Sequence, residues 1–351
     1  MMLLETLGID LPIIQAPMAG VSTPAMAAAV SNAGALGSIG VGAVDSEGAR
    51  GMIAAVRERA ARPLNVNVFC HQPAKVERTV EAGWLEHLRP HFARFDAKPP
   101  LALKETYKSF VDDDAMLAAL LADTPRVVSF HFGLPSDERI RALRGAGIVL
   151  LATATNIAEG RAAAKAGMHA VVAQGYEAGG HRGVFDPDVQ DDCLTTVALT
   201  RLLARGLEVP VIAAGGIMDG AGIAAALRLG ASAAQLGTAF VPCTESDADA
   251  GHREALAGDA ANHTVMTRAI SGRPARCLPN WFTALGEGVS PRQIPAYPIA
   301  YDAGKALNAA AKRAHESGYG AQWAGQGAPL ARERAAAKLV ASLAHEIKLH
   351  A

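Results

Sequence analysis

The chain has 351 residues, of which 50% are hydrophobic, and its formal net charge is -1. A chain of this length buries a large core and has room for one barrel with an accessory region. The balanced charge argues against nucleic acid or an anionic membrane surface as a partner.

The sequence predicts a cytoplasmic protein without a metal site. No basic segment followed by an apolar core opens the chain, so no signal peptide is expected. No apolar run reaches the roughly 18 residues of a membrane span. The four cysteines lack CxxC spacing, which indicates a reduced protein: Cys70, Cys193, Cys243 and Cys277. No histidine spacing suggests metal ligands. A monomer and a homodimer are both compatible with this composition.

Short β-rich runs alternate with helical stretches, which is typical of βαβ units and a parallel sheet. The predicted strands are Ile13–Gln15, Ala35–Ile39, Leu64–Phe69, Arg126–Phe130, Val149–Ala152, Ala170–Ala173, Val211–Ala214 and Ala233–Leu236. The predicted helices between them are Thr23–Asn32, Asp45–Arg59, Ser136–Ala146, Asn156–Ala166 and Asp219–Leu229. Eight strands in this order predict an α/β fold, the (β/α)8 TIM barrel.

Two stretches interrupt this alternation. A proline-rich, charged insertion lies between the third and fourth strands, and beyond about residue 262 the chain reads as mostly helical. We therefore expect a barrel domain of residues 1–75 and 122–262, with 325–351 packing back on it. A second, mostly helical domain of residues 76–121 and 263–324 is expected to cover the barrel mouth.

Glycines follow the seventh and eighth predicted strands, where TIM barrels often hold a phosphate. Gly215 and Gly216 end the seventh strand, and Gln235, Gly237 and Thr238 surround the end of the eighth. Glycine lets backbone N–H groups approach phosphate oxygens, and a following helix N-terminus would add a favourable dipole. One glycine pair alone would indicate only a tight turn, but two glycine-containing clusters at these two junctions favour a phosphate site. Asp219 is expected to cap the next helix.

Several further motifs lie at predicted strand ends. They are Gln15-Ala16-Pro17-Met18-Ala19-Gly20, Asn65-Val66-Asn67, His131-Phe132-Gly133 and Gln174-Gly175-Tyr176-Glu177-Ala178-Gly179-Gly180-His181-Arg182-Gly183. Near the end stand Tyr297, Tyr301, Lys305 and Trp323-Ala324-Gly325-Gln326-Gly327. In these motifs the chain resembles the nitronate monooxygenase family, formerly called 2-nitropropane dioxygenase, of the bacterial FMN-dependent type.

The resemblance implies an FMN enzyme that oxidises alkyl nitronates, such as propionate 3-nitronate, with O2. Its products would be a carbonyl compound and nitrite, and one electron would pass from the nitronate to give a flavin semiquinone. No nicotinamide is needed, and the chain contains no GxGxxG motif of that kind. The expected partners are therefore the small-molecule nitronate and O2.

His181 is the expected catalytic residue. Histidine titrates near neutral pH, so it suits a general base that removes the α-proton of a neutral nitroalkane. A protonated ring would instead pair with an anionic nitronate, so His181 is also a candidate for substrate binding. The glycines around it, at 179, 180 and 183, would let its loop reach the flavin. His131 is expected to contact substrate or flavin, although a structural hydrogen bond is equally compatible with its position.

The remaining site residues follow from the resemblance together with side-chain chemistry. Amides match the donors and acceptors of a flavin edge, and methionine can pack beneath the ring, although both types also occur as structural residues. The expected FMN contacts are Ala16, Pro17, Met18, Ala19, Asn67, Gln174, Gly179, Gly180, Gly215, Gly216, Gln235, Gly237, Thr238 and Gln326. Tyr297, Tyr301 and Lys305 are spaced for one helical face and would bind the substrate.

Two other functions fit the same residues. One is an FMN-dependent NAD(P)H reductase of quinones or enoyl thioesters, and the other is a non-enzymatic barrel that binds a phosphate ligand.

Overall fold

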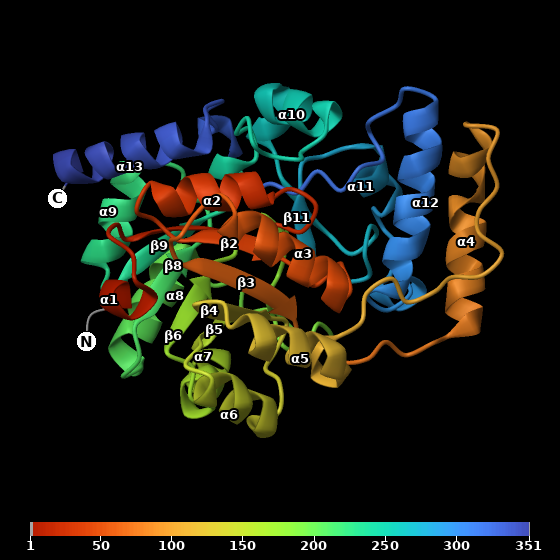
Figure 1. Ribbon diagram of the computed structural model, residues 1–351. Coiled ribbons are helices and arrows are strands. Elements are labelled where there is room, and N and C mark those ends of the chain that lie inside the picture. The colour runs from red at the N-terminus through yellow and green to blue at the C-terminus, as the bar shows by residue number, and fades with distance from the viewer. Residues whose placement is uncertain (1–2, 351) are drawn as a thin grey trace.

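The eight predicted strands form one parallel sheet in the computed structural model, which describes residues 3–350 (Figure 1). The strands are β1 Ile13–Gln15, β2 Gly37–Gly40, β3 Leu64–Phe69, β4 Val127–His131, β5 Val149–Ala154, β6 Ala170–Gln174, β8 Val211–Ala214 and β9 Ala233–Leu236. Their order is β1-β9-β8-β6-β5-β4-β3-β2, and a bridge between Ile14 and Leu36 closes the ring. The predicted (β/α)8 barrel is therefore confirmed.

Alternate residues of each strand pack on opposite faces of this barrel. Val127, Leu151 and Val172 belong to a cluster inside the ring. Their neighbours Val128 and Leu150 belong to a larger cluster that packs against outer helices. Both faces are buried, which explains why these strands appear in the sequence as continuous apolar runs rather than as an alternating pattern. The same alternation determines which residues at the strand ends face the barrel interior.

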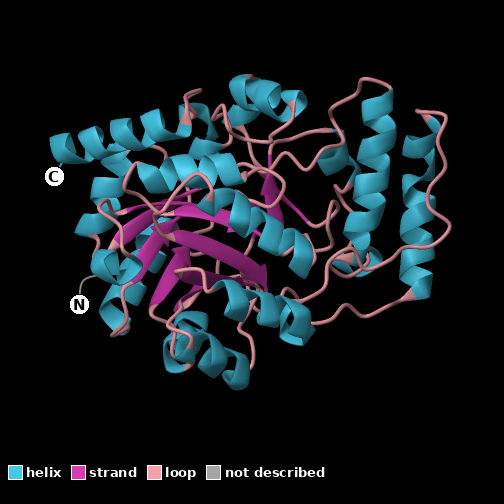
Figure 2. Cartoon of the chain, viewed as in Figure 1, coloured by secondary structure: helices cyan, strands magenta, loops and turns pink. Residues whose placement is uncertain are grey.

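Thirteen α-helices lie among the described residues, most of them around the barrel (Figure 2). They are α1 Leu3–Leu7, α2 Pro24–Asn32, α3 Ser46–Arg57, α4 Arg78–Ala93, α5 Asp114–Asp123, α6 Asp137–Gly145, α7 Ile157–Lys165, α8 Thr196–Gly206, α9 Gly220–Arg228, α10 Ala250–Ala257, α11 Trp281–Leu285, α12 Ile299–Arg313 and α13 Ala336–His350. The five helices predicted between strands begin directly after a capping side chain, such as Thr23 and Asp219.

The two segments that interrupt the alternation of strands and helices, residues 76–121 and 263–324, pack together around α4 and α12. These two helices lie side by side in Figure 1. Their shared core includes Trp84, Phe92, Phe282, Leu307 and Tyr319. This region is less purely helical than expected, because it contains β10 Val265–Thr267 and β11 Ala275–Cys277. These pair antiparallel with each other, and β11 also pairs antiparallel with β7, Gly180–His181, from the loop after β6. The division into two domains stays a prediction.

The last helix lies on the outside of the barrel. Helix α13 packs against α9 and α2 through Leu339, Val340 and Leu343, which are all buried. Figure 1 places it on the side of the barrel away from α4 and α12. Within residues 3–350, no helix is long and apolar enough to cross a membrane.

Removal of a core side chain from α12 should destabilise the protein. Leu307 is fully buried between α12 and α4, so Leu307→Ala should lower the free energy of unfolding by about 2–5 kcal/mol through lost contacts and a residual cavity. Urea denaturation followed by circular dichroism measures this change. The matched control is Leu349→Ala in α13, whose side chain is 68% exposed and should cost less than about 0.5 kcal/mol. Equal effects would contradict this account.

Candidate active site

A cavity of about 520 Å³ lies at the carboxyl ends of the barrel strands, a size typical of small-molecule sites. Its wall includes residues from the ends of β1, β3, β4, β6, β8 and β9 together with residues of α12. Of the sequence-predicted site residues, the cavity brings together Ala16, Pro17, Met18, Ala19, Asn67, His131, Gln174, Gly179, Gly180, His181, Gly215, Gly216, Gln235, Gly237, Thr238, Tyr297, Tyr301 and Lys305.

Gln326 is the one predicted site residue that does not line the cavity. It is exposed, and its backbone N–H donates to the carbonyl of Glu177 at 2.9 Å. The flanking residues Gly325 and Gly327 do face the cavity. Gly325 also donates its N–H to the hydroxyl of Thr238 at 2.9 Å. This hydrogen bond connects the loop of residues 323–327 to the segment that follows β9.

The glycines after β8 have a backbone that side chains would disrupt. Gly215 and Gly216 have φ values of 124° and 68°, and a Cβ on Gly215 would lie 2.7 Å from the Thr196 hydroxyl. The N–H groups of Gly216 and Gly237 donate to no acceptor within the described part of the chain. Two unpaired N–H groups at the mouth of a barrel suit an oxyanion such as phosphate.

Two backbone N–H groups at the start of α9, the helix after β8, already have acceptors within the protein. The N–H of Gly220 donates to a carboxylate oxygen of Glu346 at 2.8 Å, and that of Gly222 to Asp219 at 2.8 Å. Asp219 is thus the cap that the sequence predicted. Side chains of the protein thus occupy these two N–H groups, while the expected contribution of the helix dipole stays a prediction.

His181 is held at the cavity by backbone pairing and by a hydroxyl. It pairs with Ala275 in the β7–β11 ladder, and its Nε2 lies 2.9 Å from the hydroxyl of Ser271. The Ser271 hydroxyl donates to the Arg273 carbonyl at 3.3 Å, so we assign the hydrogen to Nε2 of His181. Nδ1 then carries a lone pair and forms no hydrogen bond within residues 3–350.

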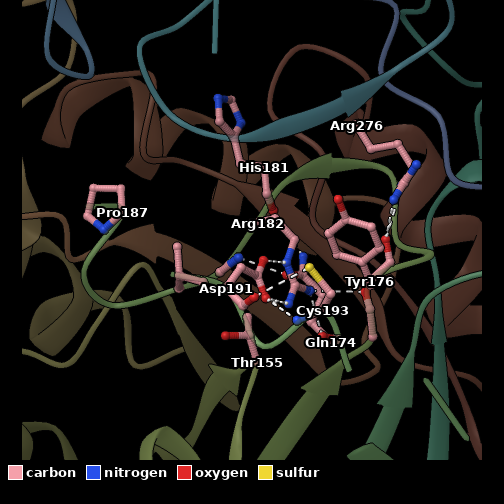
Figure 3. Close-up of polar contacts among 12 residues, drawn as sticks. Thr155, Gln174, Tyr176, His181, Arg182, Pro187, Asp191, Cys193 and Arg276 are labelled. Atoms are coloured by element: carbon pink, nitrogen blue, oxygen red, sulfur yellow. Dashed lines mark hydrogen bonds and ion pairs between the residues drawn. The ribbon is translucent and has the colours of Figure 1, made fainter. Parts of the chain in front are cut away.

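A buried ion pair fixes the loop that carries His181 (Figure 3). Arg182 is 1% exposed and makes two hydrogen bonds to Asp191, at 2.7 and 2.9 Å. It also donates to the carbonyls of Gln174 and Gly175. Bidentate arginine–carboxylate pairs of this kind have a defined geometry. In Figure 3 the Arg182 side chain points into this network, while that of His181 points away from it.

The side chain of Gln174 belongs to the same loop network. Its Nε2 donates to the His181 carbonyl at 3.0 Å, and its Oε1 accepts the N–H of Gly183 at 2.7 Å. The amide lines the cavity as expected, yet most of its hydrogen-bonding capacity is used within the protein. By contrast, Asn67 donates to the carbonyl and hydroxyl of Ser129, both at 3.0 Å, which leaves its Oδ1 for a ligand.

The histidines around the cavity are neutral at ordinary pH. Burial lowers the pKa of His181 to about 3, helped by the nearby His131 and by the charge of Arg273. Burial likewise lowers the pKa of His131 to about 4, against the opposing effect of its hydrogen bond to the His181 carbonyl. No carboxylate lines the cavity among the described residues, so nothing there stabilises a histidinium.

Phenols and one ammonium group form the side of the cavity opposite the barrel. Tyr301 and Lys305 lie on α12, whereas Tyr297 precedes the helix, so the three do not share one helical face as predicted. The Nζ of Lys305 lies 4.3 Å from the centre of the Tyr107 ring and 5.3 Å from that of Tyr301. Burial raises the pKa of Tyr301 to about 12, so this phenol is a hydrogen-bond donor at neutral pH.

Sequence reasoning missed several residues of this wall. Tyr107, Phe132 and Trp323 line the cavity, and Ser271 supports His181 from behind. Phe132 and Trp323 belong to the His131-Phe132-Gly133 and Trp323–Gly327 motifs, so the sequence did indicate that these segments lie near the site. Tyr107 lies in the irregular insertion and Ser271 in a loop, and neither position follows a predicted strand. Among residues 3–350, no group of His, Cys, Asp or Glu could hold a metal ion.

The barrel and its cavity define a class: (β/α)8 proteins with a ligand-sized cavity at the carboxyl ends of their strands. A family model described as nitronate monooxygenase matches residues 1–346. A nitronate monooxygenase of Paraburkholderia phytofirmans is 62% identical over 346 residues, which is 99% of this chain and 94% of the relative. One of Pseudomonas aeruginosa is 54% identical, covering 97% of both chains. The chain therefore belongs to the nitronate monooxygenase family of oxidoreductases.

Two solved structures are similar to this chain over almost its whole length. The nitroalkane oxidase of Streptomyces ansochromogenes superposes with a TM-score of 0.90 at 42% identity, covering 99% of this chain and 98% of that one. FabK of Thermotoga maritima superposes with a TM-score of 0.74 at 30% identity, covering 99% and 95%.

Acid should destabilise the protein through its buried histidines. His71 lies behind the cavity, where burial and the charge of Arg273 lower its pKa from 6.5 to about 4. As pH falls from 6.5 towards 4, the unfolded chain binds protons that the folded chain does not. The free energy of unfolding should therefore fall by about 1.4 kcal/mol per pH unit for each such histidine.

The variant His71→Phe isolates one of these groups, because neither ring nitrogen of His71 has a partner in the described structure. Urea denaturation at several pH values should give a shallower dependence for the variant than for the parent protein. The same slope in both proteins between pH 6.5 and 4 would refute the assignment of a lowered pKa to His71.

Proposed function

We propose that the cavity binds FMN and that the enzyme oxidises alkyl nitronates, such as propionate 3-nitronate, with O2 to a carbonyl compound and nitrite. One observation carries this proposal. A single cavity connects the unpaired N–H groups of Gly216 and Gly237 to the phenols and ammonium group of the α12 side, with no carboxylate in the described wall. An anionic phosphate would fit one end of it and an anionic nitronate the other.

The residues present fit FMN. The N–H groups of Gly216 and Gly237 would hold the phosphate together with the hydroxyl of Thr238. The free Oδ1 of Asn67 would accept an N–H of the ring, and the amide of Gln235, unpaired within the described residues, would complete its polar edge. Bound there, FMN would supply the redox chemistry, as an electron acceptor for the nitronate and an electron donor for O2.

The substrate would lie between the FMN and α12. Lys305 offers a positive charge to the nitronate oxygens, and Tyr301 offers a phenol donor. Tyr107 and Tyr297 would limit access of water to this space, because both are buried and both line the cavity. The lone pair of His181 at Nδ1 would face the carbon that bears the nitro group.

The low basicity of His181 affects which form of the substrate, the neutral nitroalkane or the anionic nitronate, the enzyme uses better. A group whose conjugate acid has a pKa of about 3 removes a carbon-bound proton only at a large energetic cost. Binding of a preformed nitronate avoids that step. We therefore infer that nitronates are better substrates than the parent nitroalkanes.

Anaerobic spectroscopy tests the function directly. Purified protein, loaded with FMN if necessary, should show flavin absorbance that bleaches on addition of propionate 3-nitronate and returns with O2, with release of nitrite. NADH and NADPH should leave the spectrum unchanged. Rapid bleaching by either nicotinamide would instead support a reductase of quinones or enoyl thioesters. A protein that takes up no FMN would leave only a barrel for another phosphate ligand.

Replacement of His181 should separate the two substrate forms. In His181→Asn, any kcat/KM for a neutral nitroalkane should fall by about 10²-fold or more, because the proton acceptor at Nδ1 is lost. For preformed nitronate the loss should stay within about tenfold, since no carbon-bound proton is removed. Oxygen consumption measures both rates. Equal losses on both substrates would show that His181 does not act mainly on the proton.

A further inference from the structure

Arg273 is a buried cation without a counter-ion. It lies in the loop between β10 and β11 and is 2% exposed. Its Nη2 donates to the carbonyls of Val184 and Phe185, and its Nε has no partner within residues 3–350. None of the ion pairs found in that range includes Arg273. By contrast, the equally buried Arg182 is paired with Asp191.

The guanidinium of Arg273 stacks on Phe132, with its carbon 4.3 Å from the ring centre. Phe132 lines the cavity, and its ring meets those of His181 and Tyr297 edge-on at 5.6 and 5.4 Å. The backbone φ of Phe132 is 75°, an unfavourable value for a bulky residue. Strain of this kind persists at functional sites where the surroundings enforce it. A single aromatic ring therefore lies between the buried charge and the cavity.

The charge of Arg273 acts on several groups around the cavity. Burial lowers the pKa of Arg273 to about 10, so the guanidinium stays protonated at neutral pH. Its charge contributes to lowering the pKa values of His181, His131 and His71. A cation costs free energy when it is buried unpaired, and its field extends further in the protein interior than in water. Glu159 and Asp186 oppose this field only from longer range.

We propose that Arg273 is a specificity-determining residue, which makes the cavity favour anionic over neutral ligands by placing a positive charge behind Phe132. An anion bound in the cavity would act as the missing counter-ion. Lys305 approaches from the α12 side, so the ligand would lie between two cations. For the substrate, the inference rests on the proposed function: Arg273 would select the nitronate over its parent nitroalkane.

The test compares a small anion with a small neutral ligand of similar shape. Nitrite and neutral nitroethane are titrated into FMN-loaded protein, and binding is followed by flavin absorbance and by tryptophan fluorescence, because Trp323 lines the cavity. In Arg273→Gln, the dissociation constant for nitrite should rise by about tenfold or more, while that for nitroethane should change less than about twofold. Arg273→Lys keeps the charge and should stay close to the parent protein for both ligands.

Arg139→Gln is the matched control. Arg139 is also buried, and it stacks on Phe110 at 5.4 Å, but neither residue lines the cavity. This variant should bind nitrite and nitroethane like the parent. If Arg273→Gln keeps the nitrite affinity of the parent, the proposal is wrong. Equal weakening of both ligands in Arg273→Gln would also overturn it, because that pattern indicates a structural defect.

A second variant keeps the proposal testable if Arg273→Gln does not fold. Lys305→Met removes the other cation, so the remaining preference for nitrite over nitroethane must come from Arg273. Loss of the whole preference in Lys305→Met would contradict the proposal. These binding measurements are independent of turnover, so a parent protein that selects anions yet fails to oxidise nitronate would refute the proposed function and leave the role of Arg273 intact.

Discussion

The pairing of β7 with β11 connects the two halves of the site. Two residue pairs, Gly180 with Arg276 and His181 with Ala275, join the loop after β6 to the segment that carries α12. The barrel alone positions the glycines after β8 and β9, and α12 alone positions its phenol and ammonium groups. This short antiparallel contact, together with the hydrogen bond to Ser271, places a histidine between them. The Arg182–Asp191 ion pair holds together the loop after β6, which carries His181.

Much of the barrel was predictable because its signals are local. Strands β1, β3, β8 and β9 begin and end at the predicted residues, since each is a short β-rich run bounded by turn residues or a capping side chain. The glycine junctions were also correct in position, because TIM barrels place their ligands at the carboxyl ends of strands. The resemblance to nitronate monooxygenases then supplied the family, which the comparisons confirm.

What escaped prediction depends on contacts between distant segments. Tyr107 reaches the cavity only because its irregular insertion folds against α12, and Ser271 reaches His181 across 90 positions. The position of Gln174 at a strand end does not reveal that its side chain hydrogen-bonds to His181 and Gly183 in the following loop. The low pKa of His181 arises from burial and from Arg273, neither of which a single motif reveals. Sequence patterns therefore identified the residues of the site better than their chemical states.

Helix α12 divides two tasks between its faces. Ala303, Leu307 and Ala311 pack into the core shared with α4, while Lys305 lines the cavity. Tyr301 lines the cavity and also packs against that core. Residues on opposite faces of one helix contribute to stability almost independently. Descendants of this sequence can therefore explore new side chains at position 305 at little risk to folding. The helix thus gives the enzyme a place where its substrate range can evolve while its architecture stays unchanged.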